Sequence, residues 1–201
     1  MSINLFSQYD SNEYSDASTR PFSVDIDAIR RRAGERMGDG AVTGAYRADR
    51  DRVIAVLNDA LATEIVCSLR YKNHYFMATG IHAQSIAEEF LEHAKQEQSH
   101  ADAIAARINQ LGGVPNLNPD GLSSRSHSEY REAEGIEAML RDDLIAERIA
   151  IEIYSEIIRW LADSDPTTRK LIEDILQVEE EHAEDIATLL RGLNWQNHEL
   201  R

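Results

Sequence analysis

Residues 172–193 read IEDILQVEEEHAEDIATLLRGL and contain the pattern that decides the fold. Apolar residues return every three or four positions, which predicts one buried face of an α-helix. Glu179 and His182 lie on that same face, three positions apart, where further apolar residues are expected. Strand-like alternation is absent from residue 46 onward, so the sequence predicts an all-α chain.

Four long helices are expected, and the connections between them define their arrangement. The first spans 46–79 and ends at Gly80, and the second has Ser85 and Glu88 in capping-box spacing and ends at Gly112. The third spans 134–162, and the fourth begins at Pro166 behind the cap Asp165 and ends at Gly192. Residues 113–133 form a long connection with a short helix inside it. One long crossover between the second and third helices predicts a four-helix bundle.

Each predicted helix carries a Glu at mid-length of its apolar face, and the second and fourth add a His three positions later. Burying even one unpaired charge costs several kcal/mol, and the apolar faces offer no Lys or Arg as a partner. Divalent cations are the remaining strong counter-charge. Oxygen and imidazole donors without thiolate suit iron, with manganese and zinc as alternatives. The predicted metal ligands and catalytic residues are Glu64, Glu97, His100, Glu147, Glu179 and His182.

The pattern occurs twice along the chain. Glu64 and Glu97 are 33 positions apart, Glu147 and Glu179 are 32 apart, and a His closes each half. Such an internal repeat implies a nearly symmetric site for two metal ions. Each ion would take one terminal Glu and one His, while Glu97 and Glu179 bridge the two ions.

Composition excludes several other functions. The 201 residues include 21 Lys and Arg against 36 Asp and Glu, giving a net charge of −15 and a pI near 4.8. This balance argues against nucleic-acid binding and favours the attraction of cations. No apolar run approaches the roughly 18 residues of a membrane span, and no signal pattern is present, so a cytoplasmic protein is expected. Cys67, the single cysteine, excludes an internal disulfide.

The N-terminal part of the chain differs from the rest. Residues 1–45 are polar, and the acidic residues around Arg30, Arg31 and Arg32 offset that basic run. A partly flexible extension is expected, with a DNA-binding arm as the alternative. The predicted division is therefore an extension over 1–45, a bundle over 46–195 and a tail over 196–201.

The four Glu and the two Glu-x-x-His pairs resemble the ferritin-like di-iron pattern. Residues 107–117, RINQLGGVPNL, and 175–182, ILQVEEEH, are most similar to bacterioferritin. This resemblance implies a ferroxidase that binds two iron ions per subunit. It would oxidise Fe(II) with O2 or H2O2 and store Fe(III) in a homo-oligomeric cage.

Two features depart from bacterioferritin. Gln98 stands where that family has the Met that binds haem between subunits, so no haem is expected. Only nine residues follow Gly192, too few for the family's fifth helix, and a Dps-like shell of 12 subunits is favoured over 24. The Dps-like proteins that share these mixed features use a cysteine pair, which Cys67 alone cannot supply.

Two alternative functions stay open from the sequence. A non-storing di-metal enzyme would resemble a rubrerythrin-like peroxidase or a manganese catalase, and a structural cation-binding bundle would have no turnover. Several single residues also have two interpretations. Tyr71, Tyr154 and His93 are either donors around the metal site or core residues, and Trp160 and Trp195 are packing or interface anchors. Glu180 and Glu181 are expected to be solvated. The histidines expected at the surface are His74, His82, His127 and His198.

Overall fold

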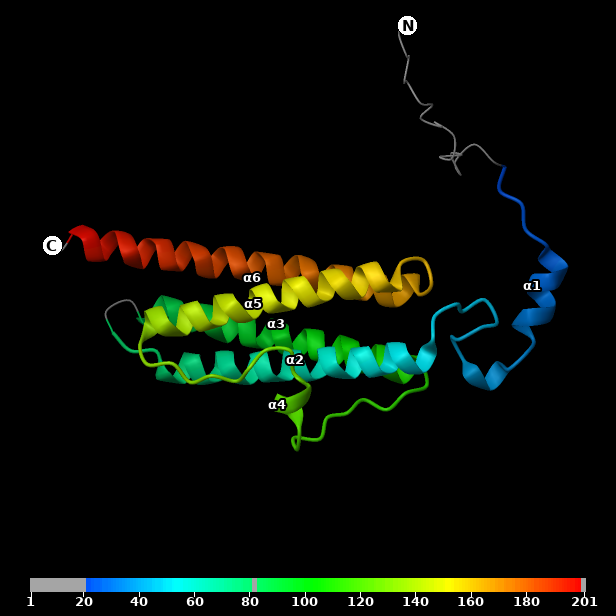
Figure 1. Cartoon of the computed structure of the whole chain (residues 1–201), viewed down its shortest axis with the longest axis horizontal. Coiled ribbons are helices and arrows are strands. Elements are labelled where there is room, and N and C mark those ends of the chain that lie inside the picture. Colours follow the sequence, from blue (N-terminus) through cyan, green and yellow to red (C-terminus); the bar gives the residue numbers. More distant parts are fainter. Residues whose placement is uncertain (1–20, 81–82, 200–201) are drawn as a thin grey trace, which may run out of the picture.

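The computed structural model describes residues 21–80 and 83–199, and every regular element within these ranges is helical. The four long helices are α2 (Arg50–Met77), α3 (Ala83–Gln110), α5 (Ile136–Leu161) and α6 (Pro166–Glu199). Helices α2 and α3 form one hairpin and α5 and α6 form a second (Figure 1). Because α3 also packs on α6 and α2 on α5, the two hairpins close into a four-helix bundle, as predicted. No helix among the described residues has the length and apolar character needed to span a membrane.

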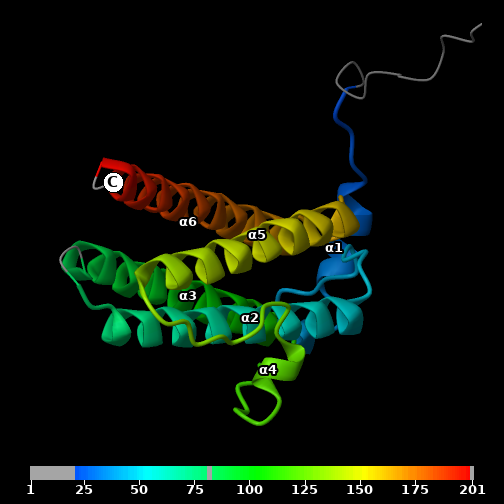
Figure 2. The ribbon, with the colours of Figure 1, turned by 60° about the vertical axis from the view of Figure 1, so that its left-hand side comes forward.

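The connection between α3 and α5 runs along the outside of the bundle. It contains the short helix α4 (Leu122–Arg125), which lies against α2 and confirms the predicted short helix (Figure 2). The Arg125 guanidinium donates to the carbonyl of Asn58 at 3.1 Å and to the carbonyl of Asn116 at 3.1 Å. One side chain therefore holds the connection on the side of α2, and the interior stays available for the facing helices.

Carboxylate caps set where two of the long helices begin. Asp49 accepts from the Arg52 amide at 3.2 Å, so α2 begins at Arg50 rather than at the predicted Tyr46. Asp165 accepts from the Thr168 amide at 2.9 Å and fixes the start of α6. The same carboxylate also accepts from Tyr46 Oη and from Arg107. It therefore joins the start of α6 to α3 and to the segment before α2.

Two further helix boundaries differ from the prediction, in addition to the start of α2. Helix α3 begins at Ala83, before the predicted cap Ser85, because the chain turns at Gly80 and the Ala83 amide donates to the Gly80 carbonyl. Helix α6 continues past Gly192 to Glu199. Gly192 does not adopt a positive φ, and a single glycine costs a helix only about 1 kcal/mol, so the helix passes through it.

The segment before the bundle contains a helix that the sequence analysis did not predict. Helix α1 (Ile26–Ala33) is capped by Asp25 and has no buried residue, and a 3₁₀ turn, η2 (Met37–Asp39), follows it. Helix α1 lies at the end of the bundle where α2 begins (Figures 1 and 2). Val42 and Tyr46 then pack against the core. The division of the chain at residue 45 stays a prediction, and residues 1–20 lie outside the described ranges.

The core consists of two apolar clusters. One includes Leu57, Ile104 and Ile172, and the other includes Phe90, Leu140 and Ile186. Along each helix the two clusters are separated by the positions where the sequence places Glu. The buried carboxylates therefore form a polar layer between two apolar halves of one bundle.

Candidate metal centre

The six predicted site residues lie in this polar layer. The four carboxylates are Glu64 on α2, Glu97 on α3, Glu147 on α5 and Glu179 on α6, and each is 1–2 % exposed. His182 is 2 % exposed and the side chain of His100 is 12 % exposed. They are buried because they occupy the core-facing positions of the helices that supply Leu and Ile on either side.

The site residues form two overlapping groups. Glu64 and His100 share one group with Glu97 and Glu179, and Glu147 and His182 share the other with the same two carboxylates. Within each group, the potential ligand atoms all lie within 4.8 Å of one another. The structure thus brings all six residues together with Glu97 and Glu179 in the middle. Their role as metal ligands stays a prediction.

The distances in the two groups are similar. His100 Nδ1 lies 3.0 Å from Glu179 Oε1 and 3.2 Å from Glu64 Oε2. His182 Nδ1 lies 3.3 Å from Glu97 Oε1 and 3.5 Å from Glu179 Oε2. Each imidazole therefore directs Nδ1 toward the carboxylates. The repeat in the sequence corresponds to two similar half-sites in space.

Several ligand atoms at the centre have no hydrogen-bond partner among the described residues. They are Glu97 Oε1, both carboxylate oxygens of Glu179, and His182 Nδ1. No Lys or Arg of the described chain forms an ion pair with any of the four carboxylates. Buried polar atoms without partners are rare and costly, so these atoms fit a centre that positive ions complete.

Two tyrosines hold the terminal carboxylates from opposite helices. Tyr71 Oη on α2 donates to Glu147 Oε1 on α5, and Tyr154 Oη on α5 donates to Glu64 Oε1 on α2. Burial raises the pKa of both phenols well above the ordinary value, so both remain protonated donors. Each hydroxyl occupies one oxygen of a terminal Glu and leaves the other oxygen facing the centre.

The pKa values of the site residues reflect four carboxylates crowded around two imidazoles. Burial alone would lower the pKa of His182, but Glu147, Glu179 and Glu97 outweigh it and raise that pKa to about 12. Burial raises the pKa of Glu97 and of Glu179, and the neighbouring carboxylates raise both further. Positive charge is therefore favoured at this point of the core, where a metal ion would compete with protons.

One residue next to the predicted site was missed. Gln96 Oε1 accepts from His182 Nε2 at 2.7 Å, which fixes the ring so that Nδ1 faces the carboxylates. Its only signal in the sequence is its place directly before Glu97.

His93 lies beside this centre on α3. Its ring stacks on that of His182 with centroids 4.0 Å apart, and it is 2 % exposed. Burial and the nearby His182 lower its pKa to about 4, so the imidazole is neutral at pH 7. His93 therefore contacts the centre directly, one of the two interpretations considered from the sequence.

A second buried polar cluster was also missed. Arg70 Nε donates to Asp143 Oδ1 at 2.8 Å, and His74 Nδ1 lies 2.8 Å from Asp143 Oδ2. All three side chains are at most 1 % exposed, so the expected surface position of His74 was wrong. Helical spacing supplied the only signal, since Asp143 precedes Glu147 by one turn and Arg70 precedes His74 by one turn.

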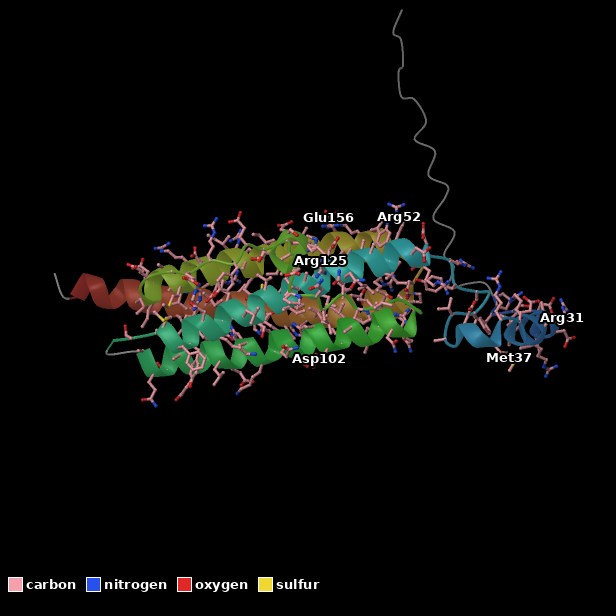
Figure 3. All side chains as sticks on the ribbon, turned by 90° about the horizontal axis from the view of Figure 1, so that it is seen from below. Arg31, Met37, Arg52, Asp102, Arg125 and Glu156 are labelled. Carbon is pink, nitrogen blue, oxygen red and sulfur yellow. The ribbon has the colours of Figure 1, made fainter. Side chains whose placement is uncertain are left out.

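The remaining predicted residues have mixed outcomes. His127 is half-buried, not a surface residue, because its ring nitrogen lies 3.0 Å from Thr63 Oγ1. Trp160 is 42 % exposed, with the Arg52 guanidinium 5.8 Å from its ring centre, and Figure 3 shows Arg52 beside Glu156 on the outside. Glu180 and Glu181 are exposed, as expected. His82 and the side chains of Trp195 and His198 lie outside the described part of the chain.

Comparisons with known proteins agree with this architecture. Residues 54–194 match the family model of the Ferritin-like domain. The nutrient stress-induced DNA-binding protein of Synechococcus sp. is 33% identical over 67% of this chain and 78% of its own length. The bacterioferritin of Rhodobacter capsulatus is 30% identical over 68% and 81%. A dodecameric thioferritin, the bacterioferritin-related protein of Bacteroides fragilis, superposes with a TM-score of 0.73 at 31% identity, covering 76% of this chain and 92% of that one.

Proposed function

Since the chain belongs to the ferritin-like family, we propose that it is an iron-storage and detoxification protein with ferroxidase activity. It oxidises Fe(II) to Fe(III) with O2 or H2O2. The observation that carries this proposal is the pair of half-sites that share Glu97 and Glu179. Two adjacent ions held by common carboxylates give their electrons to one oxidant molecule.

In this proposal each half-site holds one Fe(II) with its own pair of side chains. Glu64 and His100 hold one Fe(II), Glu147 and His182 hold the other, and Glu97 and Glu179 bridge the pair. Each Fe(II) loses one electron, so one H2O2 and two protons become two water molecules, or one O2 and two protons become H2O2.

Storage requires a closed shell, because Fe(III) released in water forms an insoluble hydroxide. We propose a homo-oligomeric cage of 12 subunits in preference to 24. The short helix α4 in the crossover supports the smaller shell, since Dps subunits carry a short helix in that connection. The 31% identity to a protein described as dodecameric also supports it.

Neither haem nor nucleic acid is expected to bind this chain. Gln98 is exposed on α3 and its amide donates to Asp102, a residue that projects from the bundle in Figure 3. An amide is a poor haem ligand, so the purified protein should show no Soret band, and one haem per two subunits would contradict this.

Nucleic acid is also not expected, because the net charge is −15, and a gel shift of DNA at low salt would contradict that expectation.

Stopped-flow absorbance tests the ferroxidase activity. Wild-type protein mixed with Fe(II) and then with O2 or H2O2 should produce ferric absorbance rapidly. The variant E97A/E179A should lose the rapid phase because both bridges are gone. The control E92A/E180A removes the same charge from exposed positions of α3 and α6 and should behave as wild type.

Sedimentation velocity of the reaction product tests storage. A ferric core that sediments with a species near twelve times the chain mass supports the proposal. A monomer or dimer that oxidises Fe(II) and precipitates ferric hydroxide would favour the non-storing di-metal enzyme. Wild-type rates in E97A/E179A would contradict the assignment of the centre itself.

A further inference from the structure

A third group of metal-binding side chains lies beside the centre, and none of its members belongs to the six residues above. It consists of Glu89 and His93 on α3 and Asp185 on α6. One potential ligand atom from each lies within 4.8 Å of the others. The group joins the two helices that carry His100 and His182, and α3 and α6 pack against each other.

His93 is the member that distinguishes this group from an acidic surface patch. It is 2 % exposed, and its Nδ1 is buried with no hydrogen-bond partner among the described residues. Its Nε2 lies 3.4 Å from Glu89 Oε1. The nitrogen that faces Glu89 is therefore Nε2, and a cation shared with the two carboxylates would bind a buried imidazole there, which an acidic surface patch does not offer.

The two carboxylates place the group at the boundary between solvent and the centre. The Glu89 side chain is 40 % exposed and Asp185 is exposed, whereas His93 stacks on the buried ring of His182. No Lys or Arg of the described chain forms an ion pair with Glu89 or Asp185. The carboxylates of the group are therefore open to water, while its imidazole contacts a residue of the centre.

We propose that Glu89, His93 and Asp185 form a third divalent-cation site, through which iron passes between solvent and the buried centre. Two carboxylates and one imidazole leave positions for water, so the ion is held incompletely and is able to move on. The transfer role rests on the proposed function, in which iron is the substrate. The metal site itself does not, so the two are tested separately.

Zinc binding tests the site without any turnover. Metal-free wild-type protein titrated with Zn(II) should bind three ions per chain, and anomalous diffraction should place one among Glu89, His93 and Asp185. The variant E89Q/D185N should bind two ions and lose that peak. The control E88Q/E184Q removes the same charge from the adjacent exposed positions and should bind three.

The outcomes separate this proposal from the previous one. Two ions in wild type, or three in E89Q/D185N, would overturn the third site and leave the centre intact. No ion at the centre would overturn the ferroxidase proposal, whatever is found at Glu89.

Repeated additions of Fe(II) to the full assembly test the transfer role. In E89Q/D185N the first addition should yield the same final amount of Fe(III) as in wild type, because the six centre residues are unchanged, but more slowly, because iron no longer passes through the third site. Later rounds should slow about tenfold, the lower end of what local negative charge contributes to cation capture. Later rounds as fast as those of wild type would overturn the transfer role.

Discussion

Two groups of buried charged residues lie in the same bundle and differ in how their buried charge is compensated. In the first, the Arg70 guanidinium pairs with the Asp143 carboxylate, and His74, Ser128 and the Glu129 carbonyl take up further hydrogen bonds. In the second, four carboxylates face two imidazoles, and central oxygen atoms have no hydrogen-bond partner among the described residues. The charge of the first cluster is balanced within the chain, although His74 Nε2 has no hydrogen-bond partner among the described residues, whereas the carboxylates of the second face no Lys or Arg.

This difference is the one expected between a structural cluster and a metal-binding site. Burial alone does not identify function, because Asp143 and Glu179 are equally inaccessible. The partners decide it: Asp143 has a permanent cation 2.8 Å away, and Glu179 has only histidines that compete for protons with its neighbours. The comparison therefore predicts opposite responses of the two clusters to mutation and to metal ions.

The largest expected effect comes from breaking the balanced cluster. Arg70→Met leaves the Asp143 carboxylate buried without its counter-charge, which should lower the free energy of unfolding by about 3–5 kcal/mol. Urea unfolding at fixed protein concentration measures this change. The control Glu137→Gln breaks an exposed pair with Arg141 on α5 and should change stability by less than about 0.5 kcal/mol. A loss below about 1 kcal/mol in Arg70→Met would show that the cluster is not the structural element described.

Of the two clusters, only the one with four carboxylates should respond to metal ions. Zn(II) at 100 times its dissociation constant should stabilise the wild-type protein by about 2.7 kcal/mol, since it binds the folded chain. E97Q/E179Q should lose the part of this stabilisation that comes from the centre, yet in the absence of metal it should be as stable as wild type or more so, because two buried charges are removed. Thermal unfolding with and without Zn(II) measures both effects. Equal stabilisation of the two proteins would place the bound metal elsewhere.

The sequence revealed the unbalanced cluster more readily than the balanced one, for a physical reason. Glu64, Glu97, Glu147 and Glu179 interrupt apolar periodicity at matching positions, and this repetition is visible along the chain. Arg70 and Asp143 lie on different helices, 73 positions apart, and their pairing depends on how those helices pack. An arginine beside a buried stripe is normally a surface residue, so the one-turn spacing of Arg70 and His74 was too weak a signal to predict that they are buried.

The fold was predictable because long apolar faces and glycine or proline boundaries are local signals. The departures occur where local signals are weak. Gly192 resembles a helix end in the sequence, but α6 continues through it because nothing there requires a left-handed backbone. Helix α1 buries no residue, so the sequence has no clear apolar face from which to predict it. The cap residue Asp25 alone is a weak signal of a helix start.

The smallest expected effect concerns the two halves of the unbalanced cluster. Tyr71→Phe removes the donor to Glu147, and Tyr154→Phe removes the donor to Glu64. Each loss should lower the free energy of unfolding of the metal-free protein by about 1.5 kcal/mol, the low end for a hydrogen bond to a charged group. Tyr71→Phe should cost slightly more, because the His182 half is 2 % exposed whereas the His100 side chain is 12 % exposed. The control Tyr130→Phe alters a 39 % exposed ring in the crossover and should have no measurable effect. If only one of the two buried tyrosines mattered, the half-sites would not be equivalent, and the symmetry inferred from the repeated Glu and His would be wrong.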